Sequence, residues 1–319
     1  MKKNVLVTGG AGFIGSNIVE KLLNEGHNVS VLDNLSTGKI ENINEFLSLQ
    51  NFTFIEGDIC DVTTCHNALK GIDLVCHQAA LGSVPRSIEF PHKTHEVNAT
   101  GFLNILHATK EAGVKRFVYA SSSSVYGDSS ISPKVEGVEG NLLSPYAVTK
   151  QLNEKYAGVY SQLHDIETVG LRYFNIFGPK QDPNGVYAAA IPKFISRLKS
   201  NEDVIINGDG LQTRDFTYVR NAVQANYLAL FNETLSEKVN VFNVACNDSF
   251  TLNHVVDFLK EGLSKSGVTS KSKIVYGPDR AGDIKHSLAN INEISNKLSY
   301  SPLYTFQEGI EEYLLSIAD

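Results

Sequence analysis

The stretch Thr8-Gly9-Gly10-Ala11-Gly12-Phe13-Ile14-Gly15 decides the fold, because of the patterns on either side of it. Residues 4–7, with the sequence Asn-Val-Leu-Val, have the β-branched and apolar composition of a buried parallel strand. After the glycines, apolar residues recur at helical spacing up to Gly26, and residues 28–32 form a second strand pattern that ends at Asp33. The chain therefore begins with a strand, a glycine-rich turn, a helix, a second strand and an acidic residue.

Three glycines of this turn each suit one physical requirement of a dinucleotide site. Gly9 permits the tight turn, Gly12 lets the backbone approach a pyrophosphate, and Gly15 lets the helix pack closely on the strand. The phosphates would then lie at the amino-terminal end of the helix. Glycine-rich turns are common, but Asp33 follows Gly15 by eighteen residues at the end of the second strand. In this context the motif predicts dinucleotide binding.

Asp33 also indicates which dinucleotide binds. A carboxylate at this position accepts hydrogen bonds from the adenosine ribose diol and repels a 2′-phosphate. The next residues, Asn34 and Leu35, provide no arginine that would accept such a phosphate. Lys39 is a cation slightly further along the chain, and it leaves NADP open as an alternative. We expect NAD as the cofactor.

Strand patterns continue to alternate with helical patterns after Asp33. Four further strands are expected, at residues 52–55, 73–77, 116–120 and 167–172. A long amphipathic helix is expected at about 94–112. This alternation predicts an α/β fold with a doubly wound parallel sheet of the Rossmann type. Ligands of such sheets bind beyond the carboxyl ends of the strands, where Asp58, residues 78–80 and residues 121–124 are expected.

The second half of the chain has a different pattern. From residue 177 onward, prolines, glycines and short elements dominate, although a helix near 220–231 and a strand near 241–244 can return to the sheet. We expect a smaller mixed α/β lobe that covers the cleft and binds the substrate. The expected dinucleotide-binding domain is 1–176 plus about 216–246, and the expected substrate-binding lobe is about 177–215 plus 247–319.

Tyr146 and Lys150 form a candidate proton-transfer pair. Residues four apart lie on one face of a helix, one turn from each other. Ser144 suits the cap before this helix, and Pro145 suits its first position. A phenol ordinarily titrates near ~10, and a neighbouring ammonium favours the phenolate that a general base needs. Taken alone, the spacing is weak, and only the dinucleotide motif upstream makes it informative.

Composition excludes several classes of protein. The chain has 319 residues and a formal net charge of -7, which argues against nucleic acid as a partner. The apolar run after Met1 stops at Thr8, too early for a signal peptide, and no later run is long enough to span a membrane. The four cysteines have no metal-ligand spacing, so we expect no metal site. We expect a cytoplasmic protein.

These motifs together resemble the extended short-chain dehydrogenase/reductase family over nearly the whole chain. The matching residues are Gly9-x-x-Gly12-x-x-Gly15, Asp33, Gly57-Asp58, the serines before Tyr126-Gly127, Tyr146-x-x-x-Lys150, Arg172-Tyr173-Phe174-Asn175 and Arg280-x-Gly282-Asp283. Within the family, the chain is most similar to nucleotide-sugar 4-epimerases, particularly the UDP-N-acetylglucosamine 4-epimerase (UDP-glucose 4-epimerase-like) branch. The stretches that carry this narrower resemblance are residues 78–87 and Tyr187-Ala188-Ala189-Ala190-Ile191-Pro192.

The resemblance implies an isomerase with a tightly bound NAD. In the implied mechanism, the Tyr146 phenolate removes the proton from the sugar 4-hydroxyl while hydride passes from C4 to NAD. Lys150 keeps Tyr146 ionised and binds the nicotinamide ribose, and Ser122, or else Ser123, lies between Tyr146 and the sugar oxygen. The 4-keto sugar turns over and takes the hydride back on its other face. Related sugar 4,6-dehydratases have an Asp-Glu pair where this chain has Ser123 and Ser124, so elimination of water is not expected.

Further site residues follow from the positions of the family's motifs. The resemblance implies that NAD is bound by Gly9, Gly12, Phe13, Ile14, Gly15, Asp33, Asn34, Asp58, Ile59, Gln78, Ala79, Ala80, Asn98, Ser121, Tyr146, Lys150 and Tyr173. It implies that the UDP-sugar is bound by Ser83, Arg86, Ser122, Ser123, Ser124, Tyr146, Asn175, Ala189, Arg214, Arg280, Asp283 and Ser287. Arg214 and Arg280 match positions that contact the diphosphate, for which guanidinium groups are well suited.

Ser287 bears on the choice of sugar. In the family, a tyrosine at this position, four residues after Asp283, blocks N-acetyl sugars, whereas a serine leaves room. We therefore expect interconversion of UDP-GlcNAc and UDP-GalNAc, with weaker action on UDP-glucose and UDP-galactose, in polysaccharide biosynthesis. One alternative is a UDP-hexuronate 4-epimerase in which Arg86 pairs with the 6-carboxylate, and another is a non-catalytic NAD-sensing protein. The family also implies a homodimer, formed through the helices near 94–112 and 145–162.

Overall fold

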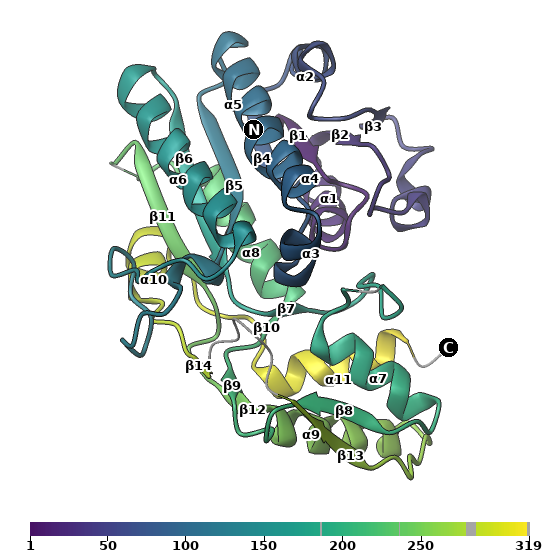
Figure 1. Cartoon of the computed structure of the whole chain (residues 1–319). Helices are drawn as coiled ribbons and strands as arrows, with labels where there is room; N and C mark the ends of the chain where they lie inside the picture. The colour runs from purple at the N-terminus through teal and green to yellow at the C-terminus, as the bar shows by residue number, and fades with distance from the viewer. Residues whose placement is uncertain (186, 236, 279–284, 318–319) are drawn as a thin grey trace.

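A seven-stranded parallel sheet lies at the centre of the protein (Figure 1). The computed structural model describes residues 1–185, 187–235, 237–278 and 285–317. The strands of the sheet are β1 (Asn4–Thr8), β2 (Asn28–Asp33), β3 (Phe52–Glu56), β4 (Leu74–His77), β5 (Arg116–Ser122), β6 (Glu167–Tyr173) and β11 (Val239–Val244). Their order is β11-β6-β5-β4-β1-β2-β3, so the chain winds outward from β1 in both directions. The predicted doubly wound sheet is therefore confirmed.

Helices cover both faces of the sheet, because successive residues of a strand point to opposite sides. Val5 and Val7 belong to the apolar core of one face, and Leu6 belongs to the core of the other. The helices around the sheet are α1 (Phe13–Asn24), α2 (Val62–Ala68), α3 (Val84–Glu89), α4 (Pro91–His95), α5 (Phe102–Glu111), α6 (Pro145–Leu163) and α8 (Val219–Phe231). Figure 1 shows α5 and α6 in front of the sheet and α8 behind it.

The helix predicted at about 94–112 is present but is not regular. A π-helical turn, η3 (Glu96–Gly101), separates α4 from α5. Within this turn, the Asn98 side chain accepts a hydrogen bond from the Leu81 N–H at 2.7 Å and donates to the Leu81 carbonyl at 3.1 Å. The widened turn therefore carries a side chain that holds the loop after β4, a use of π-turns that is frequent at functional sites.

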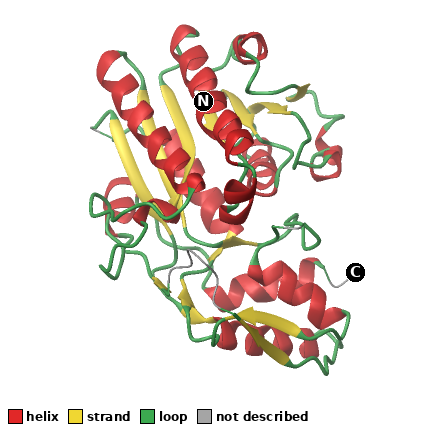
Figure 2. Cartoon of the chain, viewed as in Figure 1, coloured by secondary structure: helices red, strands yellow, loops and turns green. Residues whose placement is uncertain are grey.

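The remaining elements lie mostly below the sheet in the view of Figure 2. They are the 3₁₀ turns η1 (Ile40–Asn42), η2 (Asn44–Phe46) and η4 (Ser123–Tyr126), the strands β7 (Ile176–Phe177), β8 (Val204–Asn207), β9 (Thr213–Arg214), β10 (Thr217–Tyr218), β12 (Phe250–Thr251), β13 (Ile274–Gly277) and β14 (His286–Ser287), and the helices α7 (Ala190–Lys199), α9 (Leu252–Lys265), α10 (Asn292–Leu298) and α11 (Phe306–Ser316). Two small sheets, β12-β9-β14 and β13-β8, lie in this lower part.

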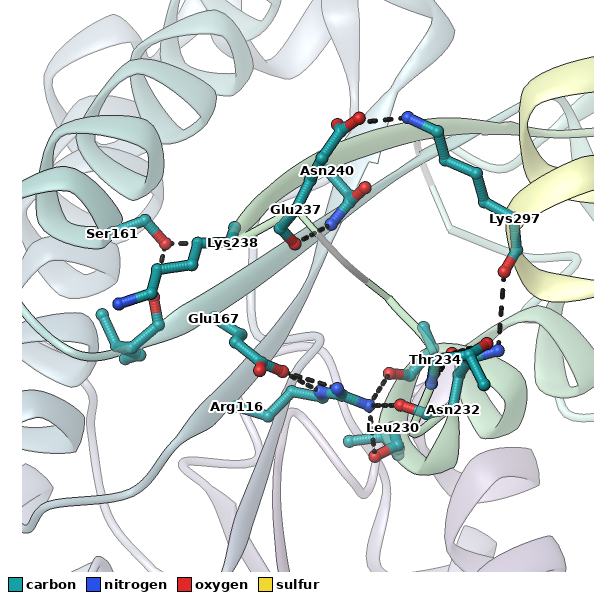
Figure 3. A network of polar contacts seen from close by, with 12 residues as sticks. Arg116, Ser161, Glu167, Leu230, Asn232, Thr234, Glu237, Lys238, Asn240 and Lys297 are labelled. Atoms are coloured by element: carbon teal, nitrogen blue, oxygen red, sulfur yellow. Dashed lines mark hydrogen bonds and ion pairs between the residues drawn. The ribbon is translucent and has the colours of Figure 1, made fainter.

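Arg116 joins the amino-terminal end of β5 to the carboxyl-terminal end of α8 (Figure 3). Its Nε donates to Glu167 Oε2 at 2.8 Å. Its Nη1 donates to the carbonyl oxygens of Ala229 at 3.3 Å, of Leu230 at 3.4 Å and of Asn232. The last carbonyls of a helix have no partner within the helix, and a cation there also interacts favourably with the helix dipole. Arg116 therefore caps α8 at the edge of the sheet opposite to the carboxyl ends of its strands.

Three smaller features bear on the sequence-based expectations. All four cysteines are free thiols. His77 is a packed histidine: its Nδ1 lies 2.8 Å from Thr8 Oγ1, its ring stacks on Phe117, and burial lowers its pKa to about 3. Among the described residues, no helix combines the length and the apolar character needed to cross a bilayer.

Candidate active site

The turn between β1 and α1 lets the protein backbone approach a ligand closely. Gly9 has φ +69°, and a Cβ atom added to it would lie 2.6 Å from the Ala79 nitrogen. A Cβ added to Gly15 would lie 2.1 Å from the Gly9 carbonyl oxygen. Helix α1 begins directly after Gly12, and its free N–H groups favour phosphate. At both positions a side chain would collide with the protein's own backbone, so the glycines permit this tight turn. The free N–H groups form a cradle that fits the pyrophosphate of a dinucleotide.

Asp33 lies at the end of β2, beside this turn. Its carboxylate accepts hydrogen bonds from the N–H groups of Ala11 at 3.0 Å and Leu35 at 2.9 Å. Burial raises the pKa of Asp33, and the two hydrogen bonds partly offset that rise. A Cβ atom on Gly38 would lie 3.0 Å from both carboxylate oxygens, so the glycine keeps the carboxylate accessible. A buried acceptor of this kind fits a ribose diol.

Asp58 is a second carboxylate at the same edge of the sheet. The Asn34 amide donates to it at 2.9 Å, and the Cys60 N–H donates to it at 2.8 Å. Burial opposes its ionisation, but these hydrogen bonds outweigh burial and lower the pKa of Asp58. Asp58 is therefore a charged acceptor whose orientation is set by its neighbours.

Tyr146 and Lys150 project from the first turns of α6, as predicted. The Ser144 side chain caps the helix by accepting from the Ala147 N–H at 3.2 Å, and Pro145 occupies the first turn. Lys150 Nζ donates to the Ala120 carbonyl at 2.8 Å and lies 5.9 Å from the centroid of the Tyr146 ring. The cap and the strand carbonyl thus fix both side chains at the carboxyl end of β5.

The electrostatics of this pair are set by burial. Burial lowers the pKa of Lys150 to about 8, and the carboxylate of Glu154 partly offsets that fall. Burial raises the pKa of Tyr146, and a hydrogen bond with the Ser122 side chain acts in the opposite direction. At neutral pH, protein groups therefore hold Lys150 mainly as a cation and Tyr146 as a neutral phenol.

These features share one cavity of about 900 Å³. Of the predicted NAD-binding residues, those that line it are Gly9, Gly12, Phe13, Ile14, Gly15, Asp33, Asn34, Asp58, Ile59, Gln78, Ala79, Ala80, Ser121, Tyr146, Lys150 and Tyr173. Of the predicted UDP-sugar-binding residues, those that line it are Ser83, Arg86, Ser122, Tyr146, Asn175 and Ala189. The cavity thus extends from Asp33 to the Tyr146–Lys150 pair and on to the loop that carries Arg86.

Other predicted residues lie elsewhere. Asn98, Ser123, Ser124, Arg214 and Ser287 are not among the described residues that line the cavity. Asn98 acts indirectly, because it holds the backbone of Leu81, which does line the cavity. Arg280 and Asp283 lie outside the described residues.

Arg214 and Ser287 lie side by side at the edge of the lower part. They are partners in the parallel pairing of β9 with β14. Ser287 is buried, with 7% of its surface exposed. The two residues expected to select the diphosphate and the sugar therefore share one small sheet.

One wall of the cavity is not predicted by any sequence pattern. It consists of residues 36–39 and Asn42 on one side, and of residues 180–182 and Tyr187 on the other. Lys39 Nζ lies 3.1 Å from an oxygen of Asp182 across this wall. Apart from Asn42, which ends the 3₁₀ turn η1, these residues occupy irregular loops, in which neither periodicity nor a spaced motif marks a binding role. Only Tyr187 stands in a stretch that resembles the epimerase branch.

Comparisons with known proteins agree with this geometry. A family model described as the NAD dependent epimerase/dehydratase family matches residues 5–245. The structure of UDP-N-acetylglucosamine 4-epimerase from Methanobrevibacter ruminantium M1, in complex with UDP-N-acetylmuramic acid, is 39% identical, with a TM-score of 0.92 and coverage of 99% of each chain. The structure of UDP-glucuronic acid 4-epimerase from Bacillus cereus, in complex with UDP-glucuronic acid and NAD, is 29% identical, with a TM-score of 0.88 and coverage of 98% of each chain.

A third similar protein is not an epimerase by name. UDP-N-acetyl-alpha-D-glucosaminuronate decarboxylase of Bacillus cytotoxicus is 32% identical, over 98% of this chain and 97% of that protein. The relatives thus differ in their sugars and in the outcome of their reactions, whereas the family model and the NAD-bound structure agree on the cofactor. The chain belongs to the NAD dependent epimerase/dehydratase family, in which it is an isomerase of the 4-epimerase type that works with NAD.

Proposed function

We propose that the protein interconverts UDP-GlcNAc and UDP-GalNAc, and acts more weakly on UDP-glucose and UDP-galactose. The observation that carries this proposal is the placement of Ser122, Tyr146 and Lys150 in one cavity with the dinucleotide cradle. The similarity to a UDP-N-acetylglucosamine 4-epimerase over 99% of both chains supports the choice of sugar.

In the proposed mechanism, Tyr146 is the base that takes the proton of the sugar O4, and Ser122 bridges Tyr146 to that oxygen. Bound NAD supplies a site that accepts a hydride from the sugar and later returns it, so the sugar passes through a 4-keto form without net oxidation. Lys150 is mainly protonated at neutral pH, because its pKa is about 8. Its ammonium group lies beside the ring of Tyr146 and stabilises the phenolate that forms.

We assign the nucleotide end of the substrate to the lower part of the molecule. Arg214 and Arg280 are proposed to bind the diphosphate, and Asp283 the uridine ribose. Asn175 lines the cavity, and its amide donates to the Asp215 carbonyl at 3.0 Å, so it joins the end of β6 to the segment after Arg214. The bond fixes the Asn175 side chain at the cavity, where we propose that it contacts the substrate phosphates.

Turnover of UDP-GlcNAc by the purified protein tests the proposal directly. We expect UDP-GalNAc to appear in a proton NMR time course, at a higher kcat/KM than that for UDP-glucose. A larger kcat/KM for UDP-glucose would contradict the choice of sugar. The same NMR time course can be recorded with UDP-glucuronic acid as the substrate. Loss of the carboxyl group from that sugar would instead indicate a decarboxylase. No turnover of any of these UDP-sugars would favour the NAD-sensing alternative.

Ser287 provides a matched test of sugar selection. A Ser287→Tyr variant places a bulky ring at a buried position, so we expect it to lose at least tenfold in kcat/KM for UDP-GlcNAc and little for UDP-glucose. His286→Tyr is the control, because the neighbouring His286 on β14 is exposed. Equal losses on both sugars, measured as kcat/KM for each pair, would refute the idea that Ser287 selects the sugar.

A UDP-hexuronate 4-epimerase is the second candidate function, and one observation favours it. Arg86 lines the cavity, its guanidinium carbon lies 4.9 Å from the centroid of the Tyr187 ring, and a guanidinium group is well suited to bind a carboxylate. A higher kcat/KM for UDP-glucuronic acid than for UDP-GlcNAc would establish this alternative. We would then expect Arg86→Leu to reduce turnover of the uronic acid selectively.

A further inference from the structure

Three polar side chains from distant parts of the chain form a closed ring of hydrogen bonds beside the cavity. The Tyr173 hydroxyl donates to Gln78 Oε1 at 3.0 Å. Gln78 Nε2 donates to Asn226 Oδ1 at 3.1 Å. Asn226 Nδ2 donates to the Tyr173 oxygen at 2.7 Å. Each of the three residues therefore donates to one of the other two and accepts from the other.

Asn226 is the member of the ring with the most contacts and the least exposure. It lies on α8 and is completely buried. Its Nδ2 also donates to the Ala222 carbonyl at 2.7 Å, and its Oδ1 accepts from the Cys76 thiol at 3.5 Å. Both N–H groups and both lone pairs of the amide are thus used. An amide held at four points has only one orientation, and so do the groups bonded to it.

The other two members face the cavity. Gln78 and Tyr173 both line it, whereas Asn226 does not. Tyr173 is the strand partner of Ser122 in the pairing of β5 with β6, and Ser122 hydrogen-bonds the Tyr146 side chain. Gln78 directly follows β4, the neighbour of β5 on its other side. The Tyr173 side of the ring therefore lies at the end of the cavity that holds Ser122 and Tyr146, while the Gln78 backbone lies against the glycine turn, its N–H donating to the Thr8 carbonyl at 3.0 Å.

We propose that Asn226 is a positioning residue for the nicotinamide end of NAD, acting through Gln78 and Tyr173. The proposal rests on the proposed placement of NAD in this cavity. A base that takes the proton of the sugar O4 must work beside the group that takes hydride from C4, because the two atoms are directly bonded. Tyr146 therefore locates the nicotinamide, and the two cavity-lining members of the ring stand next to it.

The state of Tyr173 agrees with a positioning role. Burial raises the pKa of its hydroxyl, so the group stays protonated and keeps donating to Gln78. Because that hydroxyl is already used in both directions, it has no proton to exchange with a ligand. What Tyr173 offers to the cavity is a fixed aromatic surface, and what Gln78 offers is a fixed amide edge.

Helix α8 supplies a matched control. Asn221 lies five residues before Asn226, and it is also completely buried and fully engaged. Its Oδ1 accepts from the N–H groups of Leu303 and Tyr304, both at or below 3.0 Å, and its Nδ2 donates to the Tyr304 carbonyl. These partners lie in the lower part and not beside the cavity. Truncating Asn221 thus removes a comparable buried amide that does not touch the cavity.

The test compares two nucleotides that differ only at the end in question. Titration calorimetry on nucleotide-free protein measures the Kd of NAD and of ADP-ribose, which lacks the nicotinamide. We expect Asn226→Ala to raise the Kd of NAD by about tenfold, which corresponds to the loss of one to two hydrogen bonds. ADP-ribose should bind the variant within about twofold of the wild type. Asn221→Ala should lower Tm and change neither Kd.

Two outcomes overturn the proposal: an equal loss for both nucleotides, which indicates general loosening, and an unchanged Kd for NAD. Tyr173→Phe keeps the test available even where Asn226→Ala fails to fold, because it removes a single hydroxyl. Tyr173→Phe should raise the Kd of NAD and leave the Kd of ADP-ribose unchanged. In the Asn226→Ala background it should raise the Kd of NAD by less than about twofold more, since the ring is already open. Full additivity would contradict the ring. No sugar is used, so a wrong substrate assignment leaves the result unaffected.

Discussion

The proposed role of Tyr146 as a base requires it to ionise, although its surroundings favour the neutral phenol. Burial raises its pKa, and the Ser122 hydrogen bond only partly counters that effect. The neighbouring Lys150 is itself buried, which lowers its pKa to about 8. Catalysis therefore depends on groups that stabilise the phenolate when it forms, and the Ser122 hydroxyl and the Lys150 ammonium are the two that the protein provides.

Replacing Tyr146 by phenylalanine removes the proposed base and little else. Loss of general-base catalysis costs ~10²–10⁴-fold, so we expect kcat of Tyr146→Phe to fall by at least about a hundredfold while NAD still binds. Tyr160→Phe on the same helix is the control, because Tyr160 contacts His107 and does not line the cavity. If Tyr146→Phe kept more than about a tenth of the wild-type kcat in steady-state assays, the assignment would fail.

Asp215 is a buried acid that no sequence pattern distinguishes. Its carboxylate accepts from the N–H groups of Cys246 at 3.0 Å and Ala289 at 3.3 Å. It joins the segment after β9 to the end of β11 and to the segment after β14. Burial raises the pKa of Asp215 to about 7, and the two hydrogen bonds partly offset that rise.

This shift predicts how stability depends on pH. The folded pKa exceeds the unfolded one, so the folded state binds more protons in between. The contribution of Asp215 is therefore fully present below pH ~4 and is lost as pH rises through about 7, by at most about 4 kcal/mol. Urea unfolding between pH 4 and 8 should show this loss in the wild type and not in Asp215→Asn. Asp257→Asn, at an exposed position, should follow the wild type; equal slopes in all three proteins would contradict the prediction.

At the scale of elements, α8 joins the two ends of the central strands. Arg116 caps its carboxyl-terminal end at the base of the sheet, as Figure 3 shows. Asn226, three residues before Ala229 in the same helix, bonds Gln78 and Tyr173 at the ends of their strands. The helix therefore holds a side chain beside the cavity while Arg116 caps its last carbonyls.

Arg116→Met should test how much the cap of α8 contributes to stability. The variant removes an almost buried cation and leaves the last carbonyls of α8 without partners, so we expect a loss of about 2–4 kcal/mol in the free energy of unfolding. The neighbouring pair of Lys115 and Asp165 is mostly exposed, so Lys115→Ala should change stability by about 0.5 kcal/mol or less. Denaturant unfolding measures both. A comparable effect of the two substitutions would show that the cap is unimportant.

A buried ion pair holds helix α6 on the sheet. Arg172 of β6 donates from Nε and Nη2 to the two carboxylate oxygens of Glu154 in α6, at 2.9 and 2.8 Å. Glu154 lies one helical turn after Lys150 and also accepts from Ser121 at 2.6 Å. A bidentate pair fixes direction as well as distance. The position of Lys150 thus depends on an ion pair between Arg172, which belongs to a motif of the family, and Glu154, which belongs to none of the motifs named above.

At the scale of the whole molecule, we propose two parts with the boundaries expected from the sequence. All seven strands of the central sheet lie within residues 1–176 and 216–246, and the two small sheets of the lower part draw on residues outside those segments. Asp215 and Asn175 lie at the junction of the two parts. A ligand that spans the cavity and the lower part would therefore contact both.

The homodimer stays a proposal, and α6 supplies a test. Val148, Val159 and Leu163 of this helix are 50%, 48% and 71% exposed, so an apolar stripe faces away from the sheet. We expect Val159→Asp together with Leu163→Asp to yield a monomer in size-exclusion chromatography with light scattering. Leu315→Asp, at a 67% exposed position on α11, should leave the mass unchanged. A wild-type protein that is itself a monomer would refute the proposal.

Much of the fold could be predicted because its determinants are local. Strand and helix periods, the glycine spacing of residues 9–15 and the acid at Asp33 each reflect a requirement of one segment of backbone. The spacing of Tyr146 and Lys150 predicted a pair on one helix face, the resemblance gave that pair a role, and the structure places both residues in the cavity with the glycine turn. The π-helical turn at Asn98 was not predicted, and its contact with Leu81 joins it to a loop seventeen residues earlier in the chain.

The sequence by itself determined the alternating strands and helices, the dinucleotide turn and the carboxyl-terminal edge at which the ligand residues gather. Only the tertiary structure decided which serine contacts Tyr146, which loops wall the cavity, and that Asn226 and Asp215 reach groups far away in the chain. The reason is physical. Periodicity and motif spacing record short-range steric and hydrogen-bonding demands, whereas a buried polar side chain takes its role from partners that only folding brings within about 3 Å.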